Sequence, residues 1–429
     1  MRNGDVTLAQ EVAQGRAVVA TDGGHDPTGS PLVAGPWALN SSGQVNYPLL
    51  QDFAYVALND AAIIGKAVTA SFYGQAPKYS YYQGCSTGGR QGLMLAQKYP
   101  TAYNGILSIA PALYWSSMVP GLFYPYFLQQ KYNTALPSCV VDRIRQGAIA
   151  SCDGLDGVKD GIIGNPRMCN FNPRTLVNQT VPCGELGNAT ITFNHTLIMQ
   201  NIWSGPKTTV RNGFLMWYGF SQDAFFNSAL SAINTACTGS VKNCTASPFL
   251  ISQDWLRYWI YQNASMDLSH LTDTQYRRAM SASKDTFSSI LDTSEPNLSA
   301  FKAAGGKIIA WHGLSDQLIS PQGTEKYYNA VEFLDPKVRD YYRYFEAPGV
   351  DHCAMDPNIV GPVPTTAFNN LLLWVENGTA PQTLSSVSKD GTRRRELCQY
   401  PQVSVYNKSR AMDPKRAEAF DCLASFPST

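Results

Sequence analysis

The sequence has almost no excess charge of either sign and no long hydrophobic run. Lys and Arg total 33 against 32 Asp and Glu, which gives a formal net charge of +1. Because binding to nucleic acid or to an anionic membrane needs a marked excess of basic residues, we expect neither partner. Hydrophobic residues make up 44% of the chain, but no uninterrupted apolar stretch is long enough to cross a bilayer. These absences favour a soluble protein that acts on a neutral or weakly charged small molecule.

The first residues also lack an export signal, because Met1–Asp5 begins neither a positively charged segment nor an apolar one. Two other features nevertheless indicate secretion. The 10 cysteines are an even number and are typical of an oxidising compartment. Crowded sequons predict N-linked glycans, and they begin at Asn40, Asn178, Asn188, Asn194, Asn243, Asn263, Asn297, Asn377 and Asn407. We therefore expect a secreted protein whose export signal lies upstream of this sequence.

The order of predicted strands and helices indicates a parallel α/β sheet that is interrupted by an insertion. Short β-branched runs alternate with amphipathic stretches near both ends of the chain. The predicted strands are 16–22, 78–83, 104–110, 307–311 and 341–346, and the predicted helices are 53–72, 91–98, 324–332 and 366–376.

This alternation is lost between the two halves of the sheet. Residues 114–296 carry scattered aromatic, cysteine, asparagine and glycine residues, as expected of a lid inserted into the sheet domain. We therefore expect a hydrolase domain that is built from residues 1–113 and 297–429, with a lid domain at 114–296 between its two halves. From residue 379 onward the sequence is polar and predicts an irregular segment.

The stretch Gly84-Cys85-Ser86-Thr87-Gly88 fits the pattern G-x-S-x-G, which often marks a nucleophilic serine. With 34 glycines in the chain, the bare pattern is weak. Its position between a predicted strand and a predicted helix is the context that such a serine needs, although a serine that merely caps the helix is the alternative. Ser86 is therefore the candidate nucleophile.

A serine nucleophile needs a histidine base and a carboxylate that orients the histidine. In α/β-hydrolases these follow the serine in the order acid, then histidine, on loops after late strands. Asp316 follows the predicted strand 307–311, and His352 follows the strand 341–346. They are the candidate acid and base, and we expect His312 to pack beside the acid loop. The alternatives are a turn aspartate and a surface histidine, with Asp335, Asp340 and Asp351 as competing acids.

Cys85 precedes the candidate nucleophile, and Cys353 follows the candidate base. A bridge between them would join the two loops that must meet, and it requires Cα atoms within roughly 7 Å. Neighbours of a serine and a histidine in hydrogen-bond contact satisfy that distance. We therefore predict a Cys85–Cys353 disulfide, with a buried inert thiol as the alternative for Cys85.

These segments resemble the tannase and feruloyl esterase family, especially its fungal secreted feruloyl esterases of type B. The resemblance rests on Gly84–Gly92, on His312–Asp316 and on Pro348–Cys353. It implies an α/β-hydrolase fold with a lid, a triad of Ser86, Asp316 and His352, and the Cys85–Cys353 bridge. The backbone amide of Thr87 would be one oxyanion donor.

A further segment, Cys152–Pro166, is similar to a calcium loop of the family. Its aspartates among glycines offer oxygen ligands that suit a hard cation, whereas an ordinary turn cluster is the alternative. The resemblance implies a structural calcium in the lid, held by the carboxylates of Asp153, Asp156 and Asp160 and by the carbonyls of Val158 and Ile162. Cys152 and Cys169 bracket the loop and are expected to pair, as are Cys237 with Cys244 and Cys398 with Cys422. Cys139 and Cys183 remain as the last pair.

The chain departs from the family at its start, where the early strands and a glycine-rich loop with a second oxyanion donor are missing. Losing one such donor costs roughly 3 kcal/mol of transition-state stabilisation. The sequence therefore predicts a serine esterase that releases ferulate or related hydroxycinnamates from plant cell-wall polysaccharide, with a small aromatic ester or a feruloylated polysaccharide as substrate. The alternatives are a tannase that cleaves galloyl esters and a truncated, non-catalytic glycoprotein ordered by calcium.

Overall fold

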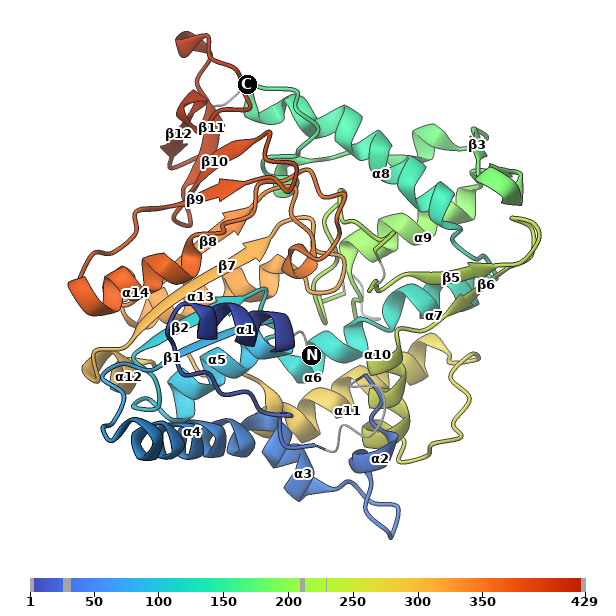
Figure 1. The fold of residues 1–429 in the computed structure, drawn as a ribbon. Helices are drawn as coiled ribbons and strands as arrows, with labels where there is room; N and C mark the ends of the chain where they lie inside the picture. The colour runs from blue at the N-terminus through green and yellow to red at the C-terminus, as the bar shows by residue number, and fades with distance from the viewer. Residues whose placement is uncertain (1–3, 26–31, 209–212, 229, 426–429) are drawn as a thin grey trace.

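Four strands form a parallel sheet at the centre of the computed structural model, which describes residues 4–25, 32–208, 213–228 and 230–425. The strand order is β1-β2-β7-β8 (Figure 1). The strands are β1 (Tyr81–Cys85), β2 (Gly105–Ile109), β7 (Lys307–Gly313) and β8 (Tyr342–Ala347). Each predicted strand in this sheet is confirmed within a few residues.

Alternating residues of these strands build a separate core on each face of the sheet. Ile308 and Ala310 of β7 pack on one face, with the helices α5 (Thr87–Lys98), α12 (Ser299–Ala303) and α13 (Pro321–Leu334). Ile309 and Trp311 pack on the other face, against α14 (Ala367–Asn377). Both faces of a parallel sheet are covered in this way, which explains why an inner strand such as β7 is a nearly continuous apolar run.

β1 is an edge of the sheet, and its outer side pairs with no other strand in the described residues. The helix before it, α4 (Ala57–Tyr73), follows a π-helical turn, η1 (Asp52–Val56), and ends at Gly74 in a left-handed conformation. Several apolar side chains of α4 are open to solvent, namely Ile63, Ile64, Val68, Phe72 and Tyr73. Within the described ranges, no helix is both long and apolar enough to span a membrane.

The predicted strand 16–22 is wrong. This segment is irregular and largely exposed, and it follows a helix, α1 (Gly4–Ala13). Its β-branched residues have strand propensity, but a strand forms only when a neighbouring strand satisfies its backbone hydrogen bonds. Val19 instead packs near Gly65 of α4.

The insertion between β2 and β7 is mainly helical and has a core of its own (Figure 1). Its helices are α6 (Trp115–Gly121), α7 (Tyr124–Lys131), α8 (Ser138–Cys152), α9 (Phe193–Ser204), α10 (Leu250–Asp254), the π-helical η6 (Trp255–Ile260) and α11 (Asp273–Leu291). Two small hairpins add β3 (Thr180–Pro182) with β4 (Asn188–Thr190), and β5 (Asn234–Cys237) with β6 (Cys244–Ser247). The core also takes in residues from the short helices α2 (Gly35–Ala38) and α3 (Tyr47–Gln51). The domain boundaries at 113 and 296 remain predictions.

The C-terminal segment is more regular than the sequence indicates. It forms two antiparallel ladders, β9 (Thr383–Val387) with β10 (Arg394–Cys398) and β11 (Val403–Tyr406) with β12 (Phe420–Leu423). Leu384 and Ser386 of β9 and Arg395 and Leu397 of β10 are buried, while the residue between each pair is not. The prediction of an irregular tail was therefore wrong, because short half-buried strands are mostly polar in composition.

Candidate active site

Ser86 lies on a sharp turn between β1 and α5. Its backbone dihedral angles are φ 64° and ψ −123°, a strained conformation for a residue other than glycine. The turn is held by hydrogen bonds from the Ser86 amide to Ile109 O (2.9 Å) and from the Arg90 amide to Ser86 O (3.0 Å). Such a turn is the strand-to-helix elbow that presents a nucleophile at the carboxyl end of a sheet.

Two glycines allow this turn to be so tight. A Cβ at Gly84 would lie 2.6 Å from the backbone of Gly88, and a Cβ at Gly89 would lie 2.4 Å from Ile109 O. The turn leaves the backbone amide of Thr87, the first residue of α5, without a hydrogen-bond acceptor in the described chain. This amide is therefore free to donate to an oxyanion.

Asp316 and His352 come from different loops and meet in the interior. His352 Nδ1 lies 2.7 Å from Asp316 Oδ2, and both side chains are fully buried. The backbone amide of His352 also donates to the Gln317 side chain (3.1 Å). Nε2 of His352 is buried and has no hydrogen-bond partner among the described residues. The imidazole is thus fixed at one nitrogen and free at the other.

The Asp316 carboxylate receives hydrogen bonds on both oxygens. Oδ1 accepts from the amides of Leu318 and Ile319 (2.8 Å each), while Oδ2 also lies 3.1 Å from His312 Nε2. Burial by itself raises the pKa of Asp316, but the charge of His352 and the hydrogen bonds from both histidines outweigh it and hold the pKa well below its usual range. Asp316 is therefore ionised beside the imidazole. His312 packs beside the acid loop, as predicted.

The predicted disulfide between the two loops is present. Cys85 and Cys353 are bonded, with their Cα atoms 6.0 Å apart, and the bridge closes a sequence separation of 268 residues. The other predicted pairs are also confirmed, including the residual one: Cys139–Cys183, Cys152–Cys169, Cys237–Cys244 and Cys398–Cys422. Of the five bridges, the one between Cys85 and Cys353 ties a neighbour of Ser86 to a neighbour of His352.

Arg90 is a structural support of the elbow that the motif did not single out. Its guanidinium is fully buried and donates to Phe53 O and Ala54 O (3.0 Å each), beside the rings of Phe53 and Trp115. Burial lowers the pKa of Arg90 to about 10, so the side chain remains charged at neutral pH. Arg90 comes shortly after the G-x-S-x-G motif, but its partners Phe53 and Ala54 belong to η1, which lies far from it in the sequence. No local sequence pattern predicts these contacts.

A buried carboxylate on the insertion also contacts the acid loop. Asp223 Oδ2 accepts a hydrogen bond from the Ser315 hydroxyl (2.7 Å), one residue before Asp316, and Phe225 N donates to Ser315 O (3.1 Å). Burial raises the pKa of Asp223 to about 6, although the Ser315 hydrogen bond and Arg145 oppose this rise. The segment around Asp223 thus positions the loop that carries the candidate acid.

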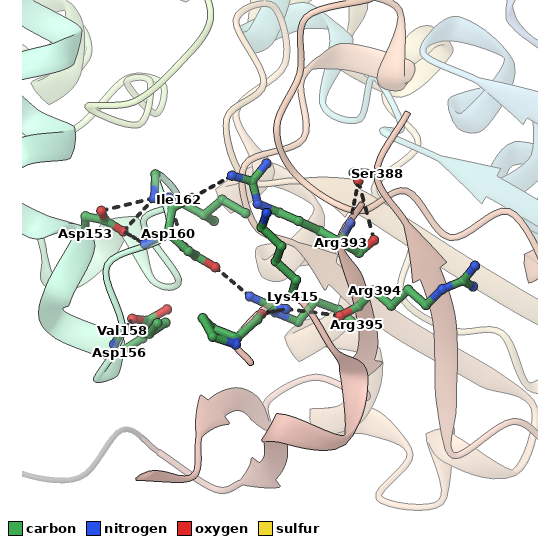
Figure 2. Close-up of polar contacts among 12 residues, drawn as sticks. Asp153, Asp156, Val158, Asp160, Ile162, Ser388, Arg393, Arg394, Arg395 and Lys415 are labelled. Atoms are coloured by element: carbon green, nitrogen blue, oxygen red, sulfur yellow. Dashed lines mark hydrogen bonds and ion pairs between the residues drawn. The ribbon is translucent and has the colours of Figure 1, made fainter. Parts of the chain in front are cut away.

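The aspartates of the predicted calcium loop lie close in sequence but bind mostly to their own backbone (Figure 2). Asp153 Oδ1 accepts from the amides of Asp160 and Gly161, and Asp156 Oδ1 accepts from Val158 N (3.2 Å). Asp160 Oδ1 accepts from Ile162 N (3.2 Å). Across the described chain, no group of three or more His, Cys, Asp or Glu side chains is gathered as metal ligands.

A C-terminal strand contacts the same loop. Arg395 of β10 forms an ion pair with Asp160 Oδ2 (2.6 Å), and Arg393 donates to Asp160 O (3.1 Å) (Figure 2). Both partners of the ion pair are nearly buried. Burial raises the pKa of Asp156 to about 7, with Asp160 and Asp153 adding to the rise. One carboxylate of the predicted ligand set is therefore neutralised by arginine, and the other two have no cationic side chain bonded to them in the described residues.

A family model described as tannase and feruloyl esterase matches residues 2–423. The chain belongs to this family. Its members are carboxylic ester hydrolases, and the chain is accordingly an enzyme of that class.

Individual relatives agree with this assignment. A probable feruloyl esterase of Arthroderma benhamiae is 38% identical, over 99% of this chain and 78% of the relative. Among solved structures, the tannin acyl hydrolase of Aspergillus niger is similar with a TM-score of 0.79 and 25% identity, over 90% of this chain and 72% of that one. Feruloyl esterase B of Aspergillus oryzae is similar with a TM-score of 0.74 and 25% identity, over 90% and 76%. The fold is that of these α/β-hydrolases.

Proposed function

We propose that the chain hydrolyses esters of ferulate or related hydroxycinnamates, as carried by plant cell-wall polysaccharides, through a serine acyl-enzyme. The observation that carries the proposal is the state of His352, which binds Asp316 through Nδ1 and keeps a buried, unpartnered Nε2 within the described residues. Ser86 is the nucleophile, and the Cys85–Cys353 bridge holds its loop next to the loop of His352. The preference for a hydroxycinnamoyl group rests on the names of the relatives.

Each of these groups has a defined role in the proposed reaction. The Ser86 hydroxyl attacks the ester carbonyl while His352 Nε2 takes its proton, and ionised Asp316 stabilises the imidazolium that forms. The Thr87 amide donates to the oxyanion. The imidazolium then protonates the departing alcohol, and a water molecule, deprotonated by the same histidine, releases the acid and restores Ser86.

Active-site labelling tests the assignment of the triad. A fluorophosphonate reacts only with an activated serine, so we expect modification of Ser86 in the native protein and none in Ser86→Ala or His352→Ala. Circular dichroism of both variants provides the control that they are folded. An unlabelled native protein, or labelling that persists in His352→Ala, would contradict the proposed base.

A tannase is the second candidate, because the tannin acyl hydrolase has the higher TM-score of the two structures described above. Both acyl groups are aromatic acids, and the difference lies in the hydroxyl pattern and the length of the acyl chain. Parallel assays with methyl ferulate and methyl gallate separate the two. A higher kcat/KM for methyl gallate would assign a tannase, and no turnover of either ester would contradict both proposals.

We also propose that the protein is secreted and glycosylated. The five disulfides suit an oxidising compartment. Most sequon asparagines are exposed, whereas Asn194 and Asn407 are partly buried. Expression in a fungal host, followed by glycosidase treatment of the medium and the cell fraction, tests both points. A protein that remains in the cells without glycans would refute them.

A structural calcium in the insertion is a third element of the proposal. The donors are oxygen atoms only, which suits Ca²⁺, and Asp153 and Asp156 have no ion-pair partner among the described residues. These two carboxylates and Asp160, with the carbonyls of Val158 and Ile162, would hold the ion. The ion would order the loop between Cys152 and Cys169 and takes no part in the ester chemistry.

The open edge of β1 and the exposed apolar side chains of α4 support a further proposal about the sheet. Soluble proteins usually cover or protect their strand edges and their large apolar surfaces. We propose that the hydrolase sheet has additional N-terminal strands, which cover the edge of β1 and the exposed apolar side chains of α4. A longer form that carries those strands should melt at a higher temperature. Equal melting temperatures would contradict this.

A further inference from the structure

A cavity of about 460 Å³ lies in the insertion and belongs to none of the groups described so far. It is lined by Asn170, Phe171, Leu197, Gln200, Asn201, Trp203, Ser204 and Gln222. Its volume falls in the range of sites that bind small molecules. The lining comes from the end of α9, from the segment after the Cys152–Cys169 bridge and from the segment that precedes Asp223.

The lining has both donors and acceptors of hydrogen bonds but no charged side chain. Gln200 uses its amide nitrogen for Asn172 Oδ1 (3.3 Å), and Asn201 uses its nitrogen for Leu197 O (2.7 Å). Their amide oxygens make no hydrogen bond within the described residues. The side chains of Asn170 and Ser204 are exposed and likewise make none there. Oxygen acceptors, amide donors and a hydroxyl are thus available to a ligand.

Two aromatic side chains, Phe171 and Trp203, complete the wall. A ligand that matches this lining must have apolar C–H faces for the rings and many hydroxyls for the amides, and it must be uncharged. An anion would meet no cation, and a purely apolar molecule would leave the amides unpaired. Neutral sugar rings have this combination of properties.

The cavity is also connected to the acid loop. Gln222 forms one wall and is fixed there, because its Oε1 accepts from Phe171 N (3.2 Å) and its Nε2 donates to Phe171 O (3.4 Å). The next residue, Asp223, binds the Ser315 hydroxyl beside Asp316 (2.7 Å). One short segment therefore shapes the cavity and contacts the loop of the candidate acid.

We propose that this cavity is a subsite for a neutral oligosaccharide, the glycan portion of the ester. The proposal rests on the proposed function, since it gives the alcohol side of the same substrate a place to bind. Gln200, Asn201 and Asn170 supply hydrogen bonds to sugar hydroxyls, and Trp203 supplies a stacking face. The subsite acts on substrate binding and not on the chemical step, and its effect therefore appears in KM.

Direct binding is the first test. Xylotetraose is titrated into the Ser86→Ala protein by calorimetry, with saturation-transfer NMR as a second readout. We expect binding in the millimolar range that weakens at least fivefold in Asn170→Ala/Gln200→Ala. The matched control is Gln382→Ala/Gln402→Ala, which removes two exposed amides elsewhere on the surface. The absence of binding, or equal weakening in both double variants, overturns the proposal.

Kinetics separate a failure of the subsite from a failure of the proposed function. The ratio of KM for a feruloylated arabinoxylo-oligosaccharide to KM for methyl ferulate should rise at least fivefold in Asn170→Ala/Gln200→Ala and stay constant in the control. A constant ratio in an enzyme that cleaves methyl ferulate refutes the subsite alone. Xylotetraose binding in a protein that cleaves neither ester refutes the proposed function alone.

Discussion

Removal of the Cys85–Cys353 bridge is expected to damage both the stability and the catalysis of this enzyme. The bridge closes 268 residues, for which loop-closure entropy gives about 5.6 kcal/mol. This is an upper value, because the smaller bridges inside the loop already shorten it. The catalytic effect has a different origin. Without the bridge, the strained elbow at Ser86 and the loop of His352 are held together only by noncovalent packing, and a displacement of about 1 Å costs roughly 10²-fold in rate.

The assay compares Cys85→Ala/Cys353→Ala with Cys237→Ala/Cys244→Ala. The control bridge closes only 7 residues, so the same relation gives about 2 kcal/mol, and it lies in a hairpin of the insertion. We measure unfolding in denaturant and then kcat on methyl ferulate at a temperature where near-ultraviolet circular dichroism shows each variant folded. We expect a fall in kcat of about 10²-fold in the first variant and little change in the second. Full kcat in folded Cys85→Ala/Cys353→Ala would refute the role of the bridge in triad geometry.

Three further outcomes are expected. Burial raises the pKa of Asp223 to about 6, so the folded protein holds this proton more tightly than the unfolded chain does. The stabilisation from this proton is therefore full below about pH 4 and is lost as the pH rises through about 6. Between pH 4 and 7, the unfolding free energy of Asp223→Asn should therefore rise by about 3 kcal/mol relative to that of the native protein. A difference in denaturant unfolding that does not depend on pH would count against this. Chelation with EGTA should lower the melting temperature and expose the loop 153–162 to protease, with Asp156→Asn insensitive to EGTA; unchanged melting and cleavage would leave the loop an ordinary turn. His312→Ala should reduce kcat by about tenfold through the lost hydrogen bond to Asp316, and native kcat on methyl ferulate would show that this bond is dispensable.

The inner strands of the sheet were predictable because they are buried and mostly apolar, whereas the edge strand β1 is only partly buried. Among the inner strands, β7 shows this most clearly, in Ile308–Trp311. The segment 16–22 has a similar composition but no strand beside it in the described structure, and composition alone does not report the neighbour. The ladder of β9 and β10 was missed for the opposite reason, since burial alternates along most of each strand and the segment is largely polar in composition.

The site was predictable where chain order and paired cysteines constrain it, and unpredictable where it depends on contacts between distant segments. The order of serine, acid and histidine selected Asp316 and His352, and the adjacent cysteines supported the same pairing. The ion pair between Asp160 and Arg395 joins residues 235 positions apart. No periodicity, spacing or motif records such a contact, and Arg395 stands in a run of arginines that by itself indicates only a charged surface.

The choice between two histidines is decided by their hydrogen bonds. His312 and His352 both contact Asp316 Oδ2, and both are fully buried, so neither the acid contact nor burial distinguishes them. His312, however, uses both ring nitrogens, because Nδ1 lies 2.8 Å from Thr324 Oγ1 and Nε2 is shared between Asp316 and Ile319 O. It has no nitrogen left for a serine. His352 keeps Nε2 free of any partner in the described chain, and its neighbour Cys353 is bonded to the residue before Ser86. These hydrogen bonds favour His352 as the proposed base and give His312 the proposed role of orienting the Asp316 carboxylate.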